Sequence, residues 1–259
     1  MDEIIHLGDY WNEEGLKANR EAIMLANREV GRLFARAYKY IKAAASIYED
    51  TAVINGWAID KAKVSAETKK VLDQYFADRP IAMKEGMERK LFASAITPDG
   101  YKNYLNSILT TEKIYILKGQ QGTGTEVLLE KIKAEALIRG YNVESYYCPL
   151  YPEKLEHLVI DQIGVSFTTS NEYHSSTVKG YGEIDLNAYL DEKVIKTYKG
   201  DLEYNKTEFD ALMNKAINTI GKAKALHDHM ETYYIPNMDF ESVQRCWETT
   251  MARILEYAK

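Results

Sequence analysis

Residues 113–126 read KIYILKGQQGTGTE, so a short apolar run leads directly into a glycine-rich loop. The first six residues are rich in isoleucine and leucine, which predicts a buried strand. The segment 125–139 has helical spacing, and Gly140 is a natural helix stop. Further strands are predicted over 142–148 and around 164–167. A strand, a glycine loop, a helix and another strand begin an α/β unit with a parallel sheet and flanking helices.

The loop carries part of a phosphate-binding motif. The pattern GxxxxGK[ST] has its two glycines at Gly119 and Gly124. The backbone amides of such a loop form a nest for one anion, and the helix N-terminus adds a positive dipole end. This predicts a nucleotide or another anion as the ligand. The candidate nucleotide-binding residues, with a histidine that follows the third predicted strand, are Gly119, Gly122, Thr123, Gly124, Thr125 and His174.

The residues that support hydrolysis are replaced. Thr125 stands where the motif has lysine, so no cation neutralises the β- and γ-phosphates. Glu126 stands where a serine or threonine would hold Mg²⁺, so we expect magnesium to lack that ligand. Its carboxylate also competes with phosphate for the helix N-terminus. The third predicted strand is followed by Thr168 and Thr169 rather than an acid, so no catalytic residue can be assigned.

An internal repeat is visible at an ungapped offset of 179 residues. Identical pairs run from Ile5 with Ile184 to Val64 with Val243, and shared helical periodicity is the alternative explanation. The repeat predicts two parts. Residues 1–80 form the helical back half of an incomplete first unit, and residues 81–259 form a complete unit with C-terminal helices.

Long helices are predicted within both parts. Asn12 is the expected cap of the first, whose apolar residues recur every three or four positions as in a helical hairpin. A second helix is expected over 60–76. In the other part, Thr207 is the expected cap of a helix, with Asp210 completing a capping box. Pro236 ends that run, and the last helix follows.

Composition excludes several classes of function. The net charge of −6 argues against nucleic acid as a partner, and no apolar run is long enough for a membrane span. The two cysteines, Cys148 and Cys246, form no CxxC pair and are expected to be reduced core thiols in a cytoplasmic protein. His227 and His229 are two residues apart on a predicted helix, which makes them a poor metal pair.

The chain resembles a family of bacterial tandem P-loop ATPase-like proteins, most of them uncharacterised. The resemblance rests on DEIIHLGDYW at 2–11, LFASAITP at 91–98, ILKG at 116–119 with the GTG that follows, and His174. It implies two P-loop units, ATP binding and hydrolysis. Of the phosphate loop, Gly119, Gly122, Thr123 and Gly124 match the family, whereas Thr125, Glu126 and Thr169 depart from it.

Three hypotheses follow. The first is a pseudoenzyme that binds nucleotide weakly at a degenerate loop. The second is an active ATPase or kinase that uses Lys118 and His174 instead of the usual residues. The third is a structural protein without nucleotide, whose long helices pair with another copy or with a partner that supplies the missing half-repeat. In that case the loop is only a strand-to-helix turn.

Overall fold

The computed structural model describes residues 4–174 and 177–257, so Asp2 and Glu3 of the resembling stretch fall outside it. The chain forms two compact units, one of residues 37–218 and one that joins the N-terminal residues up to 36 with those from 219 onward. Helices α2 (Arg20–Ala58) and α7 (Lys199–Tyr234) contribute residues to both units. Within the described residues, none of the helices has the length and apolar character needed to cross a membrane.

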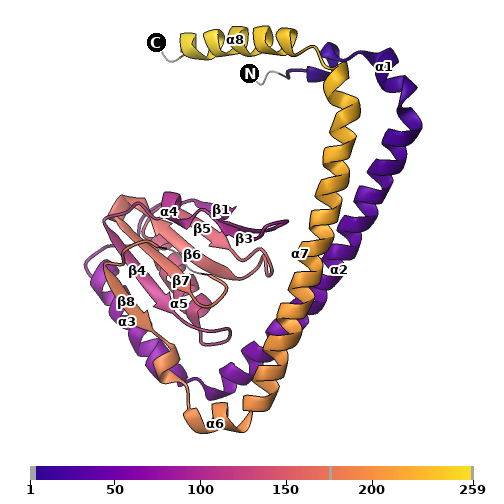
Figure 1. The fold of residues 1–259 in the computed structure, drawn as a ribbon. Coiled ribbons are helices and arrows are strands. Elements are labelled where there is room, and N and C mark those ends of the chain that lie inside the picture. The colour runs from indigo at the N-terminus through magenta and orange to yellow at the C-terminus, as the bar shows by residue number, and fades with distance from the viewer. Residues whose placement is uncertain (1–3, 175–176, 258–259) are drawn as a thin grey trace. The chain divides into compact units, whose positions relative to one another are not determined.

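A six-stranded sheet is the centre of the larger unit (Figure 1). The strands, in spatial order, are β1 (Glu88–Phe92), β5 (Val143–Tyr147), β6 (Leu155–Ile160), β7 (Val165–Ser170), β4 (Lys113–Lys118) and β8 (Gly182–Asp185). All pairs are parallel except those that β6 makes with its two neighbours. The α/β class is therefore confirmed, and the strand predicted around 164–167 corresponds to β7, but strand β6 was not predicted. The region 158–167 holds the end of β6, a turn and the start of β7.

Two helices cover one face of this sheet. Helix α5 (Thr125–Ile138) follows β4 as predicted, and α3 (Lys61–Phe76) packs beside it. The core between helices and sheet includes Ile132 of α5, Phe76 of α3 and Phe167 of β7, all at most 1% exposed. Full burial of such side chains stabilises the fold by roughly 2–3 kcal/mol each. On the other face lies α4 (Leu105–Ile108), whereas the hairpin of β2 (Ser94–Thr97) and β3 (Gly100–Asn103) packs Ile96 against α2 and α7.

The long helices form as predicted, with two changes at their starts. Asn12 caps only the short α1 (Glu13–Ala18), and α2 begins after it. The predicted cap at Thr207 is wrong, because this residue lies inside α7. Its hydroxyl donates to the carbonyl of Glu203 one turn back, an interaction that satisfies a threonine within a helix. The cap that the structure shows in this region is Asp191, at the start of α6 (Glu192–Thr197).

The same local connection occurs in each unit. In the smaller unit, the Asp239 amide donates to the Tyr10 carbonyl at 2.9 Å, before α8 (Phe240–Tyr257). In the larger unit, the Asp60 amide donates to the Tyr189 carbonyl at 3.0 Å, before α3. Tyr10 corresponds to Tyr189, and Asp60 to Asp239, at the 179-residue offset of the repeat. In each unit, the tyrosine of one copy therefore pairs with the aspartate of the other. Among the described residues, short 3₁₀ segments also lie at Leu7–Tyr10, Asp161–Ile163, Asn187–Tyr189 and Ile235–Asn237.

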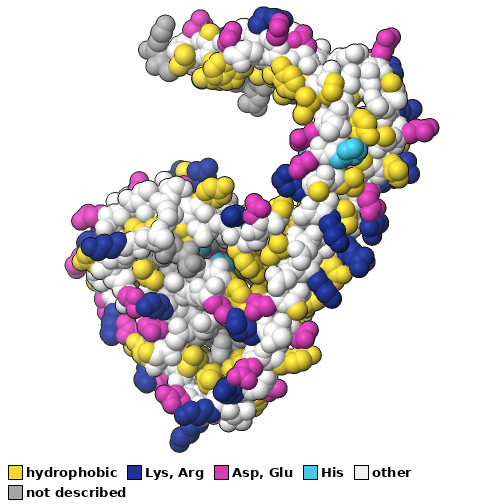
Figure 2. Space-filling model, viewed as in Figure 1, with side chains coloured by type: hydrophobic (Ala, Val, Ile, Leu, Met, Phe, Trp, Pro, Cys, Tyr) yellow, Lys and Arg dark blue, Asp and Glu magenta, His cyan; other side chains and the backbone are white. Residues whose placement is uncertain are grey.

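Helix α8 of the smaller unit has an exposed apolar side. Trp247, Ile254 and Leu255 are each more than half exposed, and Figure 2 shows hydrophobic side chains gathered along one side of this helix. Helix α3, which holds the corresponding place in the larger unit, instead buries Val71 and Phe76 in the core beneath it. The partner expected for the first half-repeat stays a prediction.

Candidate functional site

The glycine loop joins β4, which lies between β7 and the edge strand β8, to α5. Gly122 and Gly124 have φ angles of 80° and 94°, in the left-handed region that favours glycine. No hydrogen bond from the amides of Thr125, Glu126 or Val127 to another residue is found within the described chain, as expected for the first turn of a helix. The predicted strand, loop and helix are thus present, with free amides at the helix start.

Helix α2 packs directly on the outer side of this loop. A Cβ added at Gly122 would lie 2.0 Å from the carbonyl oxygen of Ala52, so the two backbones are in contact. The Asn55 side chain donates to the Gln121 carbonyl at 2.8 Å. Thr123 and Thr125 are almost fully buried, and the Thr123 hydroxyl donates to the Gln120 carbonyl at 2.7 Å. The candidate loop residues therefore face helix α2 as well as the interior of the unit.

The two residues proposed as catalytic substitutes have other partners. Lys118 Nζ lies 2.7 Å from a carboxylate oxygen of Glu183 on the neighbouring strand β8. His174 is 9% exposed, and its Nε2 lies 2.9 Å from Oε1 of Glu156. The His174 backbone is tied to the loop through Asn171, whose side chain accepts from the His174 amide and donates to the Gly119 carbonyl.

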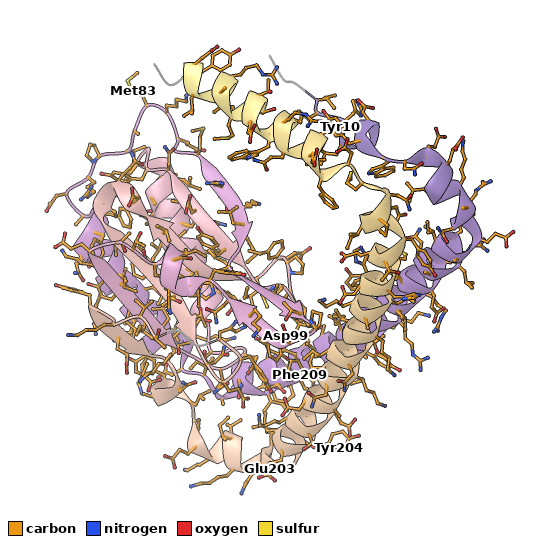
Figure 3. All side chains as sticks on the ribbon, turned by 45° about the horizontal axis from the view of Figure 1, so that its top comes forward. Tyr10, Met83, Asp99, Glu203, Tyr204 and Phe209 are labelled. Atoms are coloured by element: carbon orange, nitrogen blue, oxygen red, sulfur yellow. The ribbon has the colours of Figure 1, made fainter. Side chains whose placement is uncertain are left out.

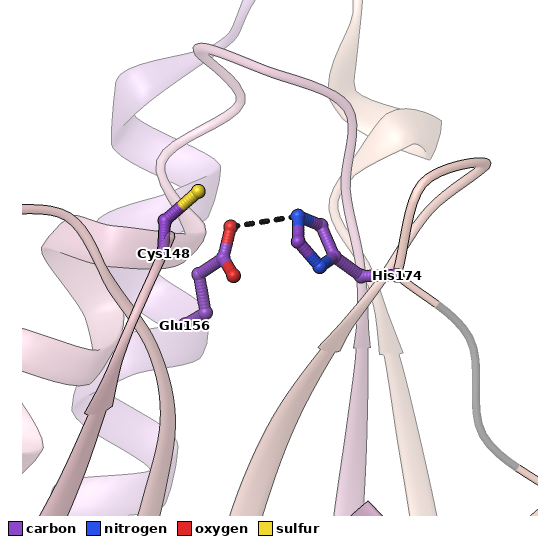
Figure 4. Close-up of side chains that lie close together, drawn as sticks. All are labelled: Cys148, Glu156 and His174. Carbon is purple, nitrogen blue, oxygen red and sulfur yellow. Dashed lines mark ion pairs between the residues drawn. The ribbon is translucent and has the colours of Figure 1, made fainter. Parts of the chain in front are cut away.

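The contact with Glu156 belongs to a buried polar cluster of three residues (Figure 4). Cys148 follows β5, Glu156 is the second residue of β6, and His174 follows β7. Because β5 and β7 are parallel and β6 runs against both, these positions meet at the same end of the strands. The glycine loop lies at this end too, since β4 is parallel to β7. One ligand-type atom from each residue lies within 4.8 Å of the others.

A β-bulge directs the Glu156 side chain. Tyr146 pairs with His157, but the next residue, Tyr147, pairs with Leu155, so Glu156 is left without a partner on β5. Such bulges re-aim a side chain and are frequent beside functional sites. Glu156 is fully buried, and within the described residues neither carboxylate oxygen has a hydrogen bond of good geometry.

The charges around the Glu156 carboxylate keep it ionised. Burial alone would raise the pKa of Glu156, but contact with His174 and the charge of Lys154 outweigh this effect and hold that pKa below its ordinary value. The Lys154 Nζ lies 3.9 Å from Oε1 of Glu156 and donates to the Tyr48 hydroxyl at 2.9 Å. The pKa of Cys148 is raised to about 12 by burial and by the Glu156 charge. The Cys148 thiol is therefore protonated at neutral pH and is a poor nucleophile.

His157 is a second buried histidine next to this cluster. Its Nδ1 lies 2.8 Å from the Thr168 hydroxyl, and its Nε2 has no hydrogen bond to the described residues. Burial is the largest effect on its protonation and lowers the pKa of His157 from 6.5 to about 4.

No family model, curated protein or solved structure matches the chain. Membership of the tandem P-loop ATPase-like family therefore stays a prediction. The site must be judged on its own residues.

Sequence reasoning found the loop and His174 but treated Cys148 as core and missed Glu156, Lys154 and His157. The available signal was the polar pair Glu156-His157 within the otherwise apolar strand LEHLVI.

The pKa of His157 predicts a loss of stability in mild acid. The unfolded histidine takes up a proton near pH 6.5, whereas the folded one stays neutral until about pH 4. The contribution of His157 to the free energy of unfolding is therefore fully present above pH 6.5. As the pH falls from 6.5 to 4, the free energy of unfolding decreases by about 3 kcal/mol. Urea unfolding across this range in EDTA should show the slope in the wild type and in His227→Asn, which changes an exposed histidine. His157→Asn should lack most of it; an unchanged slope would contradict the prediction.

Proposed function

We propose that the larger unit binds a nucleoside phosphate weakly at the loop between β4 and α5, with little or no hydrolysis. The observation that carries the proposal is the loop itself. Two left-handed glycines lead into the first turn of a buried helix whose amides have no partner among the described residues. Oriented amides at a helix N-terminus attract anions, and phosphate is the anion that such loops commonly hold.

Helix α2 divides the space above the loop into two cavities. One, of ≈ 330 Å³, is lined by Gly122 and the first turns of α5 but also by four glutamates and one lysine, so it disfavours an anion. The other, of ≈ 340 Å³, is lined by Gln120 and Gln121 of the loop and by residues of α2, α7 and the segment after β7. Phe209 and Glu203, labelled on α7 in Figure 3, belong to its wall.

The second cavity suits the proposed ligand better. Lys199 and Lys206 line it, each paired with a glutamate, so its charges are balanced rather than acidic. Tyr173 and Phe209 give it aromatic walls, and their rings lie 4.8 Å apart between centroids. Aromatic side chains of this kind provide a stacking surface for a planar base. The ligand's phosphates would then approach the loop from the side of Gln120 and Gln121.

The residues around the loop favour binding without turnover. Thr125 supplies no cation for the phosphates, and Glu126 supplies no hydroxyl for Mg²⁺ at the position where the motif has one. Lys118 is paired with Glu183, and His174 is paired with Glu156. The Glu126 carboxylate stands in the first turn of α5, where it repels a bound phosphate.

Titration calorimetry with ATP and Mg²⁺ tests the proposal. Because Glu126→Gln removes a negative charge from the first turn of α5, although on the wall of the other cavity, we expect it to tighten ATP binding by about threefold. Glu130→Gln, one turn further along α5, should change binding less. Gly124→Val should abolish binding, because valine disfavours the φ of 94° and would touch Val64.

A second candidate, a purely structural loop, is favoured by the contact of Gly122 with Ala52 and by the Asn55 hydrogen bond. It predicts no heat of binding at millimolar ATP in the wild type and in Glu126→Gln. That result would overturn the nucleotide proposal and leave the loop as the docking surface of α2.

A further inference from the structure

The buried cluster of Cys148, Glu156 and His174 at the strand ends combines three kinds of metal-binding atom. Cys148 offers a thiol sulfur, Glu156 a carboxylate oxygen and His174 a ring nitrogen, and these atoms lie within 4.8 Å of one another (Figure 4). In a tetrahedral zinc site, neighbouring ligand atoms are about 3.3–3.8 Å apart. Side-chain adjustments of about an ångström would therefore bring the three atoms to one ion, without a change in the sheet.

The state of Glu156 is the observation that points to a ligand. It is fully buried, and within the described residues neither of its oxygens receives a well-aligned hydrogen bond. A buried carboxylate without such donors is costly unless a cation lies beside it. His174 Nε2 at 2.9 Å and the Lys154 ammonium at 3.9 Å both lie beside Oε1, but Lys154 gives its hydrogen bond to Tyr48, so the carboxylate oxygens keep lone pairs for an additional cation. The bulge in β6 keeps the carboxylate in this position.

A small cavity next to the cluster leaves room for an additional ligand. It has a volume of ≈ 30 Å³, enough for a water molecule, and Cys148 and His174 line it. Ser94 also lines it, and the buried Ser94 hydroxyl has no hydrogen bond to the described residues. A water molecule there would bond to this hydroxyl and complete the coordination of an ion held by the three side chains.

We propose that Cys148, Glu156 and His174 bind one divalent cation of the zinc class, with a water molecule as the fourth ligand. Sulfur, nitrogen and oxygen donors in one set favour zinc over magnesium or calcium, which prefer oxygen alone. Binding converts the Cys148 thiol to a thiolate, and its proton leaves to solvent. The site has three protein ligands and one exchangeable ligand, which is the arrangement of catalytic rather than structural zinc sites.

Two cationic or titratable groups face the site from neighbouring positions. Lys154 opposes a second positive charge, whereas the buried His157, whose ring centroid lies 6.4 Å from that of His174, adds no fixed charge when neutral. Two anionic ligands, the thiolate and the carboxylate, neutralise the two positive charges of the ion. The positive charge of the Lys154 ammonium then remains at the site. The other group of possible ligands among the described residues, His227, Asp228 and Glu231, is exposed on one helix and has none of these features.

Cobalt binding to the full chain tests the proposal. After removal of bound metal with EDTA and dialysis against Co²⁺, we expect one ion per chain and an absorption band from thiolate-to-cobalt charge transfer. The band should disappear in Cys148→Ser and remain in Cys246→Ser, the matched control. His174→Gln and Glu156→Gln should weaken Zn²⁺ binding at least about tenfold.

Two further measurements keep the result interpretable. Circular dichroism identifies any variant that fails to fold, and added Zn²⁺ should raise the Tm of the wild type but not of folded Cys148→Ser. The proposal is overturned if the wild type binds no stoichiometric ion, or if the band is unchanged in Cys148→Ser. Loss of the band in Cys246→Ser alone would also overturn it. No nucleotide is present, so the result is independent of the calorimetric test above.

Discussion

The Gly122→Ala variant should lose about 4 kcal/mol of unfolding free energy, from backbone strain and overpacking together. The φ of 80° at Gly122 lies where side chains are strained. The added methyl group would also meet the Ala52 carbonyl at 2.0 Å, and this atom belongs to the backbone of α2, so it cannot move aside by rotation of a bond. Urea unfolding followed by circular dichroism measures the change.

Gly56→Ala is the matched control for that substitution. Gly56 lies in α2, one turn beyond Ala52, and a Cβ there meets no atom within 4 Å. Alanine at such a helical position should stabilise the chain by about 0.5–1 kcal/mol. If Gly122→Ala is as stable as the wild type, the contact between the loop and α2 does not exist in solution.

The β4–loop–α5 segment was predictable because its signals are local. An apolar run, spaced glycines and a helical pattern each specify their own backbone, and β4 has the predicted bounds Lys113–Lys118. The role of Gly122 was not predictable in full. Its φ follows from the loop motif, but its contact with Ala52 depends on where a helix 70 residues earlier in the chain packs. Tertiary contacts of this kind leave no periodic signal.

The polar cluster was missed for a related reason. The strand LEHLVI contains two ionisable residues, and burial of both is a tertiary effect that the alternation of side chains does not predict. The antiparallel direction of β6 and the bulge at Glu156 bring Cys148 and His174, which are 26 residues apart, to the same carboxylate. Sequence reasoning assigned His174 to a phosphate because it follows a predicted strand and matches a histidine of the resembling family, and neither signal shows that Glu156 lies against it.

Lys154→Met should destabilise the metal-free chain by about 3–5 kcal/mol, because it removes the cation beside a buried carboxylate. The Lys154 side chain is 15% exposed and lies between Glu156 and Tyr48, whose ring centroid is 5.2 Å from Nζ. Methionine fills most of its volume, so the loss is mainly electrostatic. Lys206→Met is the control, since its ion pairs with Glu172 and Asp210 are about half exposed and contribute about 0–1 kcal/mol. Equal effects of the two substitutions would contradict a buried charge at Glu156.

A double-mutant cycle separates the charge from the packing. Glu156→Gln keeps the shape of the side chain but removes the charge that Lys154 neutralises, so Lys154→Met in that background should cost about 1–3 kcal/mol less than in the wild type. The measurement is urea unfolding in EDTA at pH 7, where the lowered pKa of Glu156 keeps it ionised. Additive effects would mean that Lys154 acts through its contact with Tyr48 alone. A large coupling would show that the fold keeps an ionised carboxylate in its interior, which is the condition that a cation bound by Cys148, Glu156 and His174 requires.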